Sequence, residues 1–393
     1  MNKISKAGLD RLDPEKYVCG DDVEKPEGIL VRSADLHSAP INPELLCIAR
    51  AGAGVNNIPV AQCAEAGIVV FNTPGANANA VKELVLCALL LSSRKIVQGI
   101  HWAKTLADQG DAAAKLVEKG KSAFVGPEIR GKKLGVIGLG AIGAMVANAA
   151  QRLGMDVYGY DPYISIDAAW KLSRSVVHAR DLKTIFENCD YITLHVPATD
   201  ETRNTICAET LATMKPGVRI INLARAELVN TADMLAALES GQASAYVTDF
   251  ADAKLLSAEN VIVMPHLGAS TPESEENCAE MAVEELTRYI EEGVIRNSVN
   301  YPHLEMDREG IYRICVLHKN VPKMVGGVTN IFAEADINIE NMANRSKKDY
   351  AYTVVDVNTK PNDAIIEKIR SIDGIIRVRV LEDPDYARRM ELQ

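Results

Sequence analysis

Short apolar runs recur along the first 93 residues of the chain, at intervals of roughly twenty residues. They begin at Gly28, Leu46 and Ile68, and turn or helix signals separate them. Runs of this length and spacing are typical of βα units around a parallel sheet. The next stretch predicts one long helix over residues 79–100, and alanine-rich helical residues then lead to a Gly-Pro break at 126–127.

The β-rich signal is strongest between Lys132 and His266. Six short runs follow one another there, separated by helical or turn residues: KKLGVI, MDVYGY, YITLHV, VRIINL, AYVTDF and NVIVMP. Six such units predict an α/β fold with a doubly wound Rossmann sheet. Residues 272–293 then have the pattern of an amphipathic helix with acidic residues in its first turn.

The tail of the chain, residues 311–393, has a different pattern. Strand-like and helix-like stretches follow one another there in the order βαββαβ, which is typical of a ferredoxin-like domain. Residues 296–310 carry polar and turn-forming residues and predict a linker before this tail.

Composition limits the kind of protein this is. A length of 393 residues predicts two or three domains. The net charge of −10 argues against nucleic acid or an anionic membrane as a partner, although a local basic pocket can still take a small anion. We expect no membrane span and no signal peptide. Eight scattered cysteines without a C-x-x-C pair indicate reduced thiols in a cytoplasmic protein, with no metal site.

One glycine-rich motif indicates a cofactor. Gly138, Gly140 and Gly143 form G-x-G-x-x-G between an expected strand and an expected helix, and the next strand ends at Asp161. Such glycines permit a tight turn, close approach to a pyrophosphate and close packing of helix on strand. An acidic residue at the position of Asp161 binds the ribose hydroxyls and repels a 2′-phosphate, which favours NAD over NADP. The alternative is a purely structural βα turn.

Polar residues follow several expected strands, where ligands bind in doubly wound sheets. Arg225, Asp249 and His266 come after three runs of the central segment, and Arg50 comes after an N-terminal run. A histidine can accept the proton of a substrate hydroxyl while hydride leaves the same carbon, and an arginine can hold an α-carboxylate. A surface salt bridge and a structural histidine are the alternatives.

The stretches NTPGANANAVKELV, LGVIGLGAIG, LHVPATDETRNTI, INLARAELV and MPHLGAST resemble the D-isomer-specific 2-hydroxyacid dehydrogenases, over residues 27 to 300. ARAGAGVNN, PHLGAST and the tail resemble the branch of that family that oxidises 3-phospho-D-glycerate to 3-phosphohydroxypyruvate, the first step of serine biosynthesis. The tail itself resembles an ACT regulatory domain, for which L-serine is the implied effector.

The resemblance implies an organisation in domains. Residues 1–93 and 270–300 would form a discontinuous, flavodoxin-like substrate domain, 94–269 the NAD domain and 311–393 the ACT domain. It also implies a homodimer or homotetramer.

Individual residues receive roles from the same resemblance. It implies that His266 is the general acid/base and that Arg225 binds substrate carboxylate. The implied substrate contacts are Arg50, Asn77 and Arg32, and the implied effector contacts are His318, Asn320 and Asn338. The implied cofactor-lining residues are Thr73, Gly138, Gly140, Ala141, Ile142, Gly143, Asp161, Val196, Leu223, Ala224, Arg225, Asp249, Gly268 and Ala269.

Two departures from the family pattern matter. The resemblance implies a glutamate shortly after Asp249 that bonds the catalytic histidine, but Ala253 or Lys254 stands at that place. Asp252 is the candidate substitute, because a nearby carboxylate favours the protonated imidazole and fixes its tautomer. In the tail, Lys323 replaces a glycine that lets a small ligand approach the backbone.

Two other functions remain open. The chain could reduce glyoxylate or hydroxypyruvate, which would leave Arg50 without a phosphate to bind. It could also be an NAD-sensing protein without turnover, a possibility that the missing glutamate raises.

Overall fold

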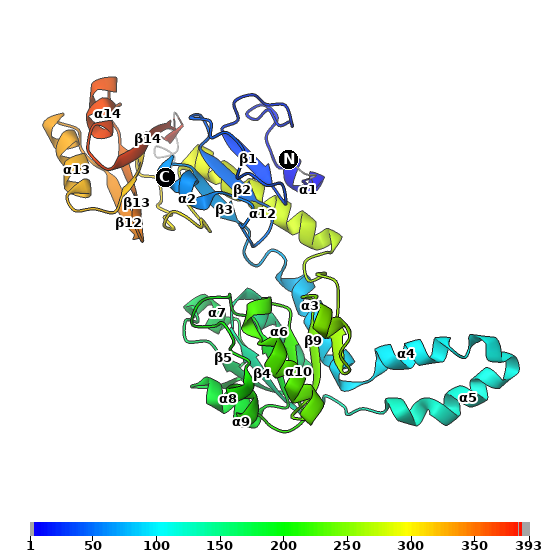
Figure 1. Ribbon diagram of the computed structural model, residues 1–393. Coiled ribbons are helices and arrows are strands. Elements are labelled where there is room, and N and C mark those ends of the chain that lie inside the picture. The colour runs from blue at the N-terminus through cyan, green and yellow to red at the C-terminus, as the bar shows by residue number, and fades with distance from the viewer. Residues whose placement is uncertain (1–3, 384, 387–393) are drawn as a thin grey trace. The chain divides into compact units, whose positions relative to one another are not determined.

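The computed structural model describes residues 4–383, 385 and 386 (Figure 1). Contacts divide the chain into unit 1, residues 1–76 with 275–393, and unit 2, residues 77–274. We expected the first boundary near residue 93, but helix α3 (Ala78–Ser93) packs its apolar face into the core of unit 2. The end of the expected tail, residues 384 and 387–393, lies outside the described residues.

Unit 2 is built on a seven-stranded parallel sheet with the order β10-β9-β8-β7-β4-β5-β6. This order confirms the doubly wound fold. The runs expected as strands are all present, and the additional β6 has only two residues, too few to give an apolar run. The strands are β4 (Lys133–Ile137), β5 (Asp156–Tyr160), β6 (Val177–His178), β7 (Tyr191–Leu194), β8 (Val218–Asn222), β9 (Ala243–Thr248) and β10 (Val261–Val263).

Both faces of this sheet are covered, as a parallel sheet requires. Successive strand residues point to opposite faces, so Ile220 packs in one core and Ile221 in the other. Besides α3, the helices of the sheet domain are α6 (Ala141–Arg152), α7 (Ile166–Trp170), α8 (Leu182–Asn188), α9 (Ala208–Thr213), η3 (Ala226–Leu228), α10 (Thr231–Ser240) and α11 (Ala253–Leu256).

The single helix expected over residues 79–100 is wrong. The chain turns extended at Arg94, and α4 (Ile96–Lys104) begins a separate hairpin with η1 (Ala107–Ala112), α5 (Ala113–Gly120) and η2 (Lys121–Phe124). In the last turn of α3 the hydroxyls of Ser92 and Ser93 donate back to Leu89 O, bonds that weaken a helix by competing for its carbonyl groups. None of the four hairpin elements buries a residue, and Figure 1 shows α4 and α5 extending away from the sheet of unit 2.

Unit 1 contains a three-stranded parallel sheet, β1-β2-β3, in place of a larger flavodoxin-like sheet. Its elements are α1 (Lys6–Leu9), β1 (Gly28–Val31), β2 (Cys47–Arg50), α2 (Val60–Glu65), β3 (Val69–Asn72) and most of α12 (Pro272–Glu292). Helix α12 covers the sheet with Ala282, Leu286 and Tyr289, all buried.

The prediction of a linker over residues 296–310 is wrong for Asn300 and Tyr301, which pack next to β3. The side chain of Asn300 accepts from Val70 N at 2.9 Å and donates to Ile68 O at 2.8 Å, so it pairs with the strand as a neighbouring backbone would. Tyr301 is fully buried, and its hydroxyl donates to Ala64 O. These polar side chains close the edge of the sheet.

The tail has the expected βαββαβ order and an antiparallel sheet, β12-β13-β11-β14. Its elements are β11 (Tyr312–Lys319), α13 (Met324–Glu334), β12 (Asn341–Lys347), β13 (Tyr350–Val357), α14 (Asp363–Arg370) and β14 (Ile375–Glu382). One sheet face packs on the two helices through Ile314 and Val316. The other face, with Cys315 and Leu317, joins the core that contains Phe71 and Tyr289.

Polar bonds reinforce this shared core of unit 1. Arg313 and Asp356 form a buried ion pair at 2.8 Å. The guanidinium of Arg377 donates to Leu45 O and Ala66 O in the region of β2 and β3. No helix among the described residues is both long and apolar enough to span a membrane.

Candidate functional site

The glycine loop after β4 has the geometry that a dinucleotide needs. Gly138 has φ +93°, and a Cβ there would lie 2.7 Å from His195 O. At Gly143 a Cβ would overlap Gly138 O, whereas the space beside Gly140 is open. Helix α6 starts directly after Gly140 without a side-chain cap or an acidic residue in its first turn. Free N–H groups and the helix dipole therefore face that open space, which suits a pyrophosphate.

Asp161 is fixed at the end of β5. Its Oδ2 accepts from Leu139 N at 2.8 Å, and its Oδ1 accepts from Tyr163 N at 2.9 Å. A carboxylate has further lone pairs, so Asp161 can still accept from ribose hydroxyls. The loop and Asp161 together fit NAD.

Arg225, Asp249 and His266 follow the adjacent strands β8, β9 and β10 at their carboxyl ends. The turn that carries Arg225 is held by Asn222, whose Oδ1 accepts from Ala224 N at 3.2 Å and whose Nδ2 donates to Arg225 O at 2.8 Å. Asn222 is fully buried, and the sequence analysis missed it. The available signal was an asparagine directly after the apolar pair Ile220 and Ile221, at the end of the expected strand.

His266 is exposed, and the ring of Phe250 packs against it edge-on with centroids 5.4 Å apart. Asp249 is buried, and its Oδ1 has no hydrogen-bond partner among the described residues. Burial raises the pKa of Asp249, while the charges of His266 and Arg225 act in the opposite direction. The edge of the sheet thus presents an imidazole, a guanidinium and a buried carboxyl group.

The structure gives Asp252 a different position from the one expected. It is exposed and stands at the N-cap of α11, where its Oδ1 accepts from Lys254 N at 2.8 Å. No contact between Asp252 and His266 occurs within the described part of the chain.

The other expected cofactor-lining residues lie on two units. Val196, Leu223, Ala224, Gly268 and Ala269 follow strands of the unit 2 sheet, and Ala141 and Ile142 open α6. Thr73 follows β3 in unit 1, and its buried hydroxyl lacks a partner among the described residues.

The expected phosphate contacts lie in unit 1. Arg50 ends β2, and its buried Nε has no partner among the residues that the structure describes. Burial and the nearby charge of Arg32 both lower the pKa of the Arg50 guanidinium. Arg32 also pairs with Glu275 at 2.7 Å. Gly52, which the sequence analysis missed, leaves room for Arg50, because a Cβ there would overlap the guanidinium. Asn77, the remaining expected substrate contact, stands at the N-cap of α3 in unit 2 without a side-chain capping bond.

The expected effector residues are engaged within the tail. His318 is 2% exposed, with Nδ1–H donating to Lys319 O at 2.7 Å and Nε2 lying 2.8 Å from Thr353 Oγ1. The amide of Asn320 donates to Lys348 O at 2.9 Å. Asn338 Nδ2 donates to Glu340 Oε1 at 3.1 Å. Lys323 has φ +73°, a left-handed conformation that favours glycine.

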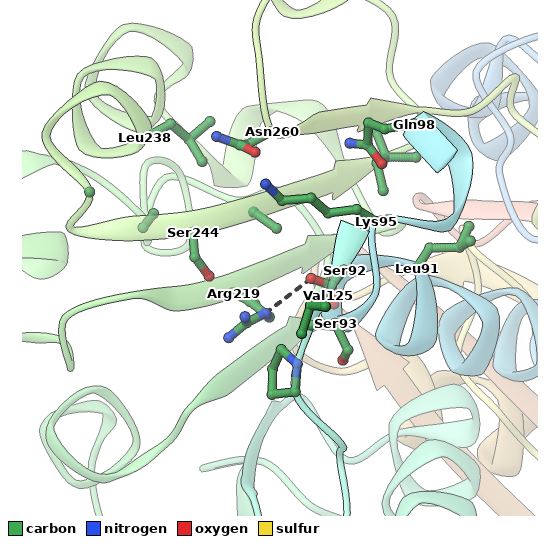
Figure 2. A pocket seen from close by; sticks show the side chains of 16 residues that line it. Leu91, Ser92, Ser93, Lys95, Gln98, Val125, Arg219, Leu238, Ser244 and Asn260 are labelled. Carbon is green, nitrogen blue, oxygen red and sulfur yellow. Dashed lines mark hydrogen bonds between the residues drawn. The ribbon is translucent and has the colours of Figure 1, made fainter. Parts of the chain in front are cut away.

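A cavity of about 300 Å³ lies at the opposite edge of the unit 2 sheet (Figure 2). Arg219 and Ser244, near the starts of β8 and β9, line it together with Lys95 and Gln98. The dashed line in Figure 2 is the 3.0 Å bond from Arg219 Nε to Ser92 O. Because Arg225, Asp249 and His266 follow the other ends of the same strands, this cavity is separate from the candidate site.

Known proteins share much of this sequence. Residues 88–268 match the D-isomer specific 2-hydroxyacid dehydrogenase, NAD binding domain. The chain is 32% identical to the D-3-phosphoglycerate dehydrogenase of Haemophilus influenzae over 351 residues, which is 86% of this chain and 82% of that protein. The chain belongs to the D-isomer specific 2-hydroxyacid dehydrogenase family.

Other members of this dehydrogenase family extend the comparison. The D-3-phosphoglycerate dehydrogenase of a Synechocystis strain is 36% identical over 73% of this chain, which spans only 51% of that relative. The NAD+-bound 3-phosphoglycerate dehydrogenase of Entamoeba histolytica has a similar structure, with TM-score 0.55 and 27% identity, over 74% of this chain and 88% of that one. Residues 312–374 match the ACT domain. These matches confirm the NAD-binding domain and the ACT domain expected from the sequence.

Proposed function

We propose that this dehydrogenase oxidises 3-phospho-D-glycerate to 3-phosphohydroxypyruvate with NAD, the first step of the phosphorylated route to L-serine. The names of the relatives in Haemophilus and Synechocystis support this substrate. The observation that carries the proposal is that Arg50, in unit 1, is partly buried and its Nε lacks a hydrogen-bond partner among the described residues.

A guanidinium that is half-buried beside a second positive charge is costly unless an anion offsets it. Arg50 is such a group, with Arg32 near it and a bond-free Nε among the described residues. A phosphate dianion would offset the positive charge of Arg50, and its several acceptor oxygens would provide the hydrogen bond that Nε lacks. An unphosphorylated acid such as glycerate leaves Arg50 uncompensated.

The residues of unit 2 supply the chemistry. Arg225 holds the substrate carboxylate, and His266 accepts the proton of the C2 hydroxyl. As that O–H bond breaks, the C2–H bond also breaks, its hydride leaves for the nicotinamide, and a C2 carbonyl forms. NAD, when bound, supplies the hydride acceptor. In the reverse direction a protonated His266 returns its proton to the carbonyl oxygen, so we expect forward turnover to rise with pH through the histidine range.

The deciding experiment measures NADH formation at alkaline pH with 3-phosphoglycerate and, separately, with D-glycerate. We expect turnover with the phosphorylated acid only. An Arg50→Ala variant should raise KM for 3-phosphoglycerate by about 10–100-fold, the range of one charged hydrogen-bonded contact. Turnover with D-glycerate alone, or with glyoxylate or hydroxypyruvate in reverse, would transfer the chain to another branch of the family. NAD binding without any turnover would favour a sensor.

We also propose that the protein is a homodimer or homotetramer. The hairpin of α4 and α5 leaves Ile96 and Ile100 at 43% and 50% exposure and buries none of its own residues. A second copy of the chain would remove this apolar surface from water. Light scattering after size exclusion tests this, and a monomer at micromolar concentration would contradict it.

For the ACT domain we propose a small-molecule effector, with L-serine as the first ligand to titrate. His318 and Asn320 must exchange internal hydrogen bonds to reach it, so we expect inhibition only at millimolar serine. Unchanged steady-state rates at that concentration would exclude serine. We place the enzyme in the cytoplasm, with no nucleic acid or membrane partner.

A further inference from the structure

Asp249 combines burial with an unused hydrogen-bonding atom. Asp249 is only 4% exposed, and its Oδ1 has no hydrogen-bond partner among the described residues. A buried carboxylate without enough hydrogen bonds is destabilising unless a nearby positive charge compensates it. A positively charged group near Asp249 is therefore needed to stabilise its carboxylate.

The segments after β9 and β10 bring Asp249 close to His266. Val263 pairs with Thr248 in the parallel sheet, and Met264 N donates to Thr248 O at 2.8 Å. One residue beyond Asp249, Phe250 packs against the imidazole of His266.

The carboxyl group of Asp249 also lies close to Gly268. Asp249 Oδ2 lies 3.7 Å from the place that a Cβ of Gly268 would occupy, two residues after His266. The carboxyl group of Asp249 is therefore next to the segment that carries His266.

The charged groups that act on this carboxyl group come from two other segments. His266 follows β10, Arg225 follows β8, and both attract the Asp249 carboxylate. Asp252, the other acid of the segment, is exposed and caps α11. Of these two acids, Asp249 is therefore the one whose charge interacts with that of His266, although no hydrogen bond or ion pair joins the two side chains among the described residues.

We propose that Asp249 is the positioning residue of His266: its buried carboxylate orients the imidazole and stabilises the imidazolium that forms when a substrate hydroxyl loses its proton. The kinetic part of this inference rests on the proposed function. The pairing itself does not, because His266 can be protonated without any substrate.

The first test needs no turnover. Histidine labelled with ¹³C at Cε1 gives one resonance for each of the seven histidines, and His266→Gln identifies that of His266 by its loss. In Asp249→Asn we expect the titration midpoint of this resonance to fall by about one pH unit or more, because the neutral amide no longer favours the imidazolium. Asp249→Ser is a second neutral variant in case the amide disturbs the loop, and Asp249→Glu should restore the midpoint.

The second test is kinetic. In Asp249→Asn, kcat should fall by about 10²-fold, and the acidic limb of the forward pH–rate profile should move to lower pH. Asp181→Asn, which alters only the N-cap of α8, is the matched control. It should leave the acidic limb of the pH–rate profile unchanged. A loss confined to KM for NAD would mean that Asp249 only contacts the cofactor, and it would overturn the proposal.

The remaining outcomes separate the two proposals. An unchanged midpoint in both neutral variants, or a shift produced by Asp252→Asn instead, overturns the pairing. If the wild type turns over no D-2-hydroxy acid while the midpoint still falls in Asp249→Asn, the proposed function fails and the pairing stands.

Discussion

His266 and His318 show how differently two regions of this molecule use the same side chain. At the carboxyl edge of the unit 2 sheet, His266 is exposed, and its described ring contact is with Phe250. In the ACT domain, His318 is buried and uses both ring nitrogens within the fold. Both stood out in the sequence as ligand contacts, yet only His266 keeps hydrogen-bonding capacity for a ligand.

The same contrast holds for other residues that the sequence singled out. Asp249 and Arg50 each keep a buried polar atom without a partner among the described residues, whereas Asn320 caps the turn between β12 and β13. Unsatisfied buried polar atoms are rare, and a ligand is one common reason for them. Hydrogen-bonding capacity therefore separates candidate site residues from structural ones better than residue type does.

The largest effect is expected from His266→Gln. Removing the general base should lower forward kcat by about 10²–10⁴-fold, while thermal stability stays near the wild-type value because the ring is exposed. Steady-state kinetics and calorimetry test this, with NAD affinity as the control. A variant that keeps most of its turnover would place His266 with His318, among the structural histidines.

Glu285 tests the rule that a buried polar atom without a hydrogen-bond partner marks a ligand site. It has such an atom but is not a candidate site residue. Its Oε1 accepts from Asn297 at 2.6 Å, Oε2 has no partner among the described residues, and burial raises the pKa of Glu285 to about 8.

The sign of its effect on stability follows from that raised pKa. The folded state keeps the proton after the unfolded state has lost it, so stability is fully present below about pH 4.5 and falls as pH rises to about 8. Glu285→Gln should be about 2 kcal/mol more stable than the wild type at pH 9 and nearly equal at pH 5. Urea unfolding at the two pH values measures this, and equal stability at pH 9 would contradict it.

His318→Ala should leave turnover without effector unchanged and lower the free energy of unfolding by about 2 kcal/mol, through two lost hydrogen bonds and a small cavity. Burial lowers the pKa of His318, so the unfolded state takes up a proton first as pH falls. Wild-type stability should therefore decrease below about pH 6.5, and His318→Ala should lack this decrease. Denaturant unfolding from pH 7 to 5 tests both statements. Loss of turnover in a folded variant would contradict the structural role.

Lys323→Gly should give the smallest effect, a gain of about 0.5–1 kcal/mol. Lysine in a left-handed conformation is strained, and glycine removes that strain at a smaller cost in entropy. Lys323→Ala keeps the Cβ and is the matched control, for which we expect no gain. Equal melting temperatures for the glycine and alanine variants would contradict the argument.

Much of this architecture was predictable because it depends on local patterns. The apolar runs of unit 2 became strands, and Gly138 and Gly143 were required by a tight turn whose neighbours leave no room for a Cβ. The errors concern residues whose role depends on distant partners. Asn300 looks like a linker residue until its side chain pairs with β3, and Arg94 looks helical although the backbone turns extended there. Asp252 suited a catalytic carboxylate in sequence, but it caps a four-residue helix.

The core shared by the ACT sheet and the small parallel sheet of unit 1 has a practical consequence. Cys315, Leu317 and Tyr352 pack in one cluster with Phe71 and Tyr289. Deleting the chain after residue 310 would remove much of this cluster, including the guanidinium of Arg379 over the ring of Tyr289, so the truncated protein should aggregate rather than remain an active enzyme. An ACT domain is therefore best exchanged between homologues together with the rest of unit 1, with chimera crossovers at the unit boundaries after residues 76 and 274.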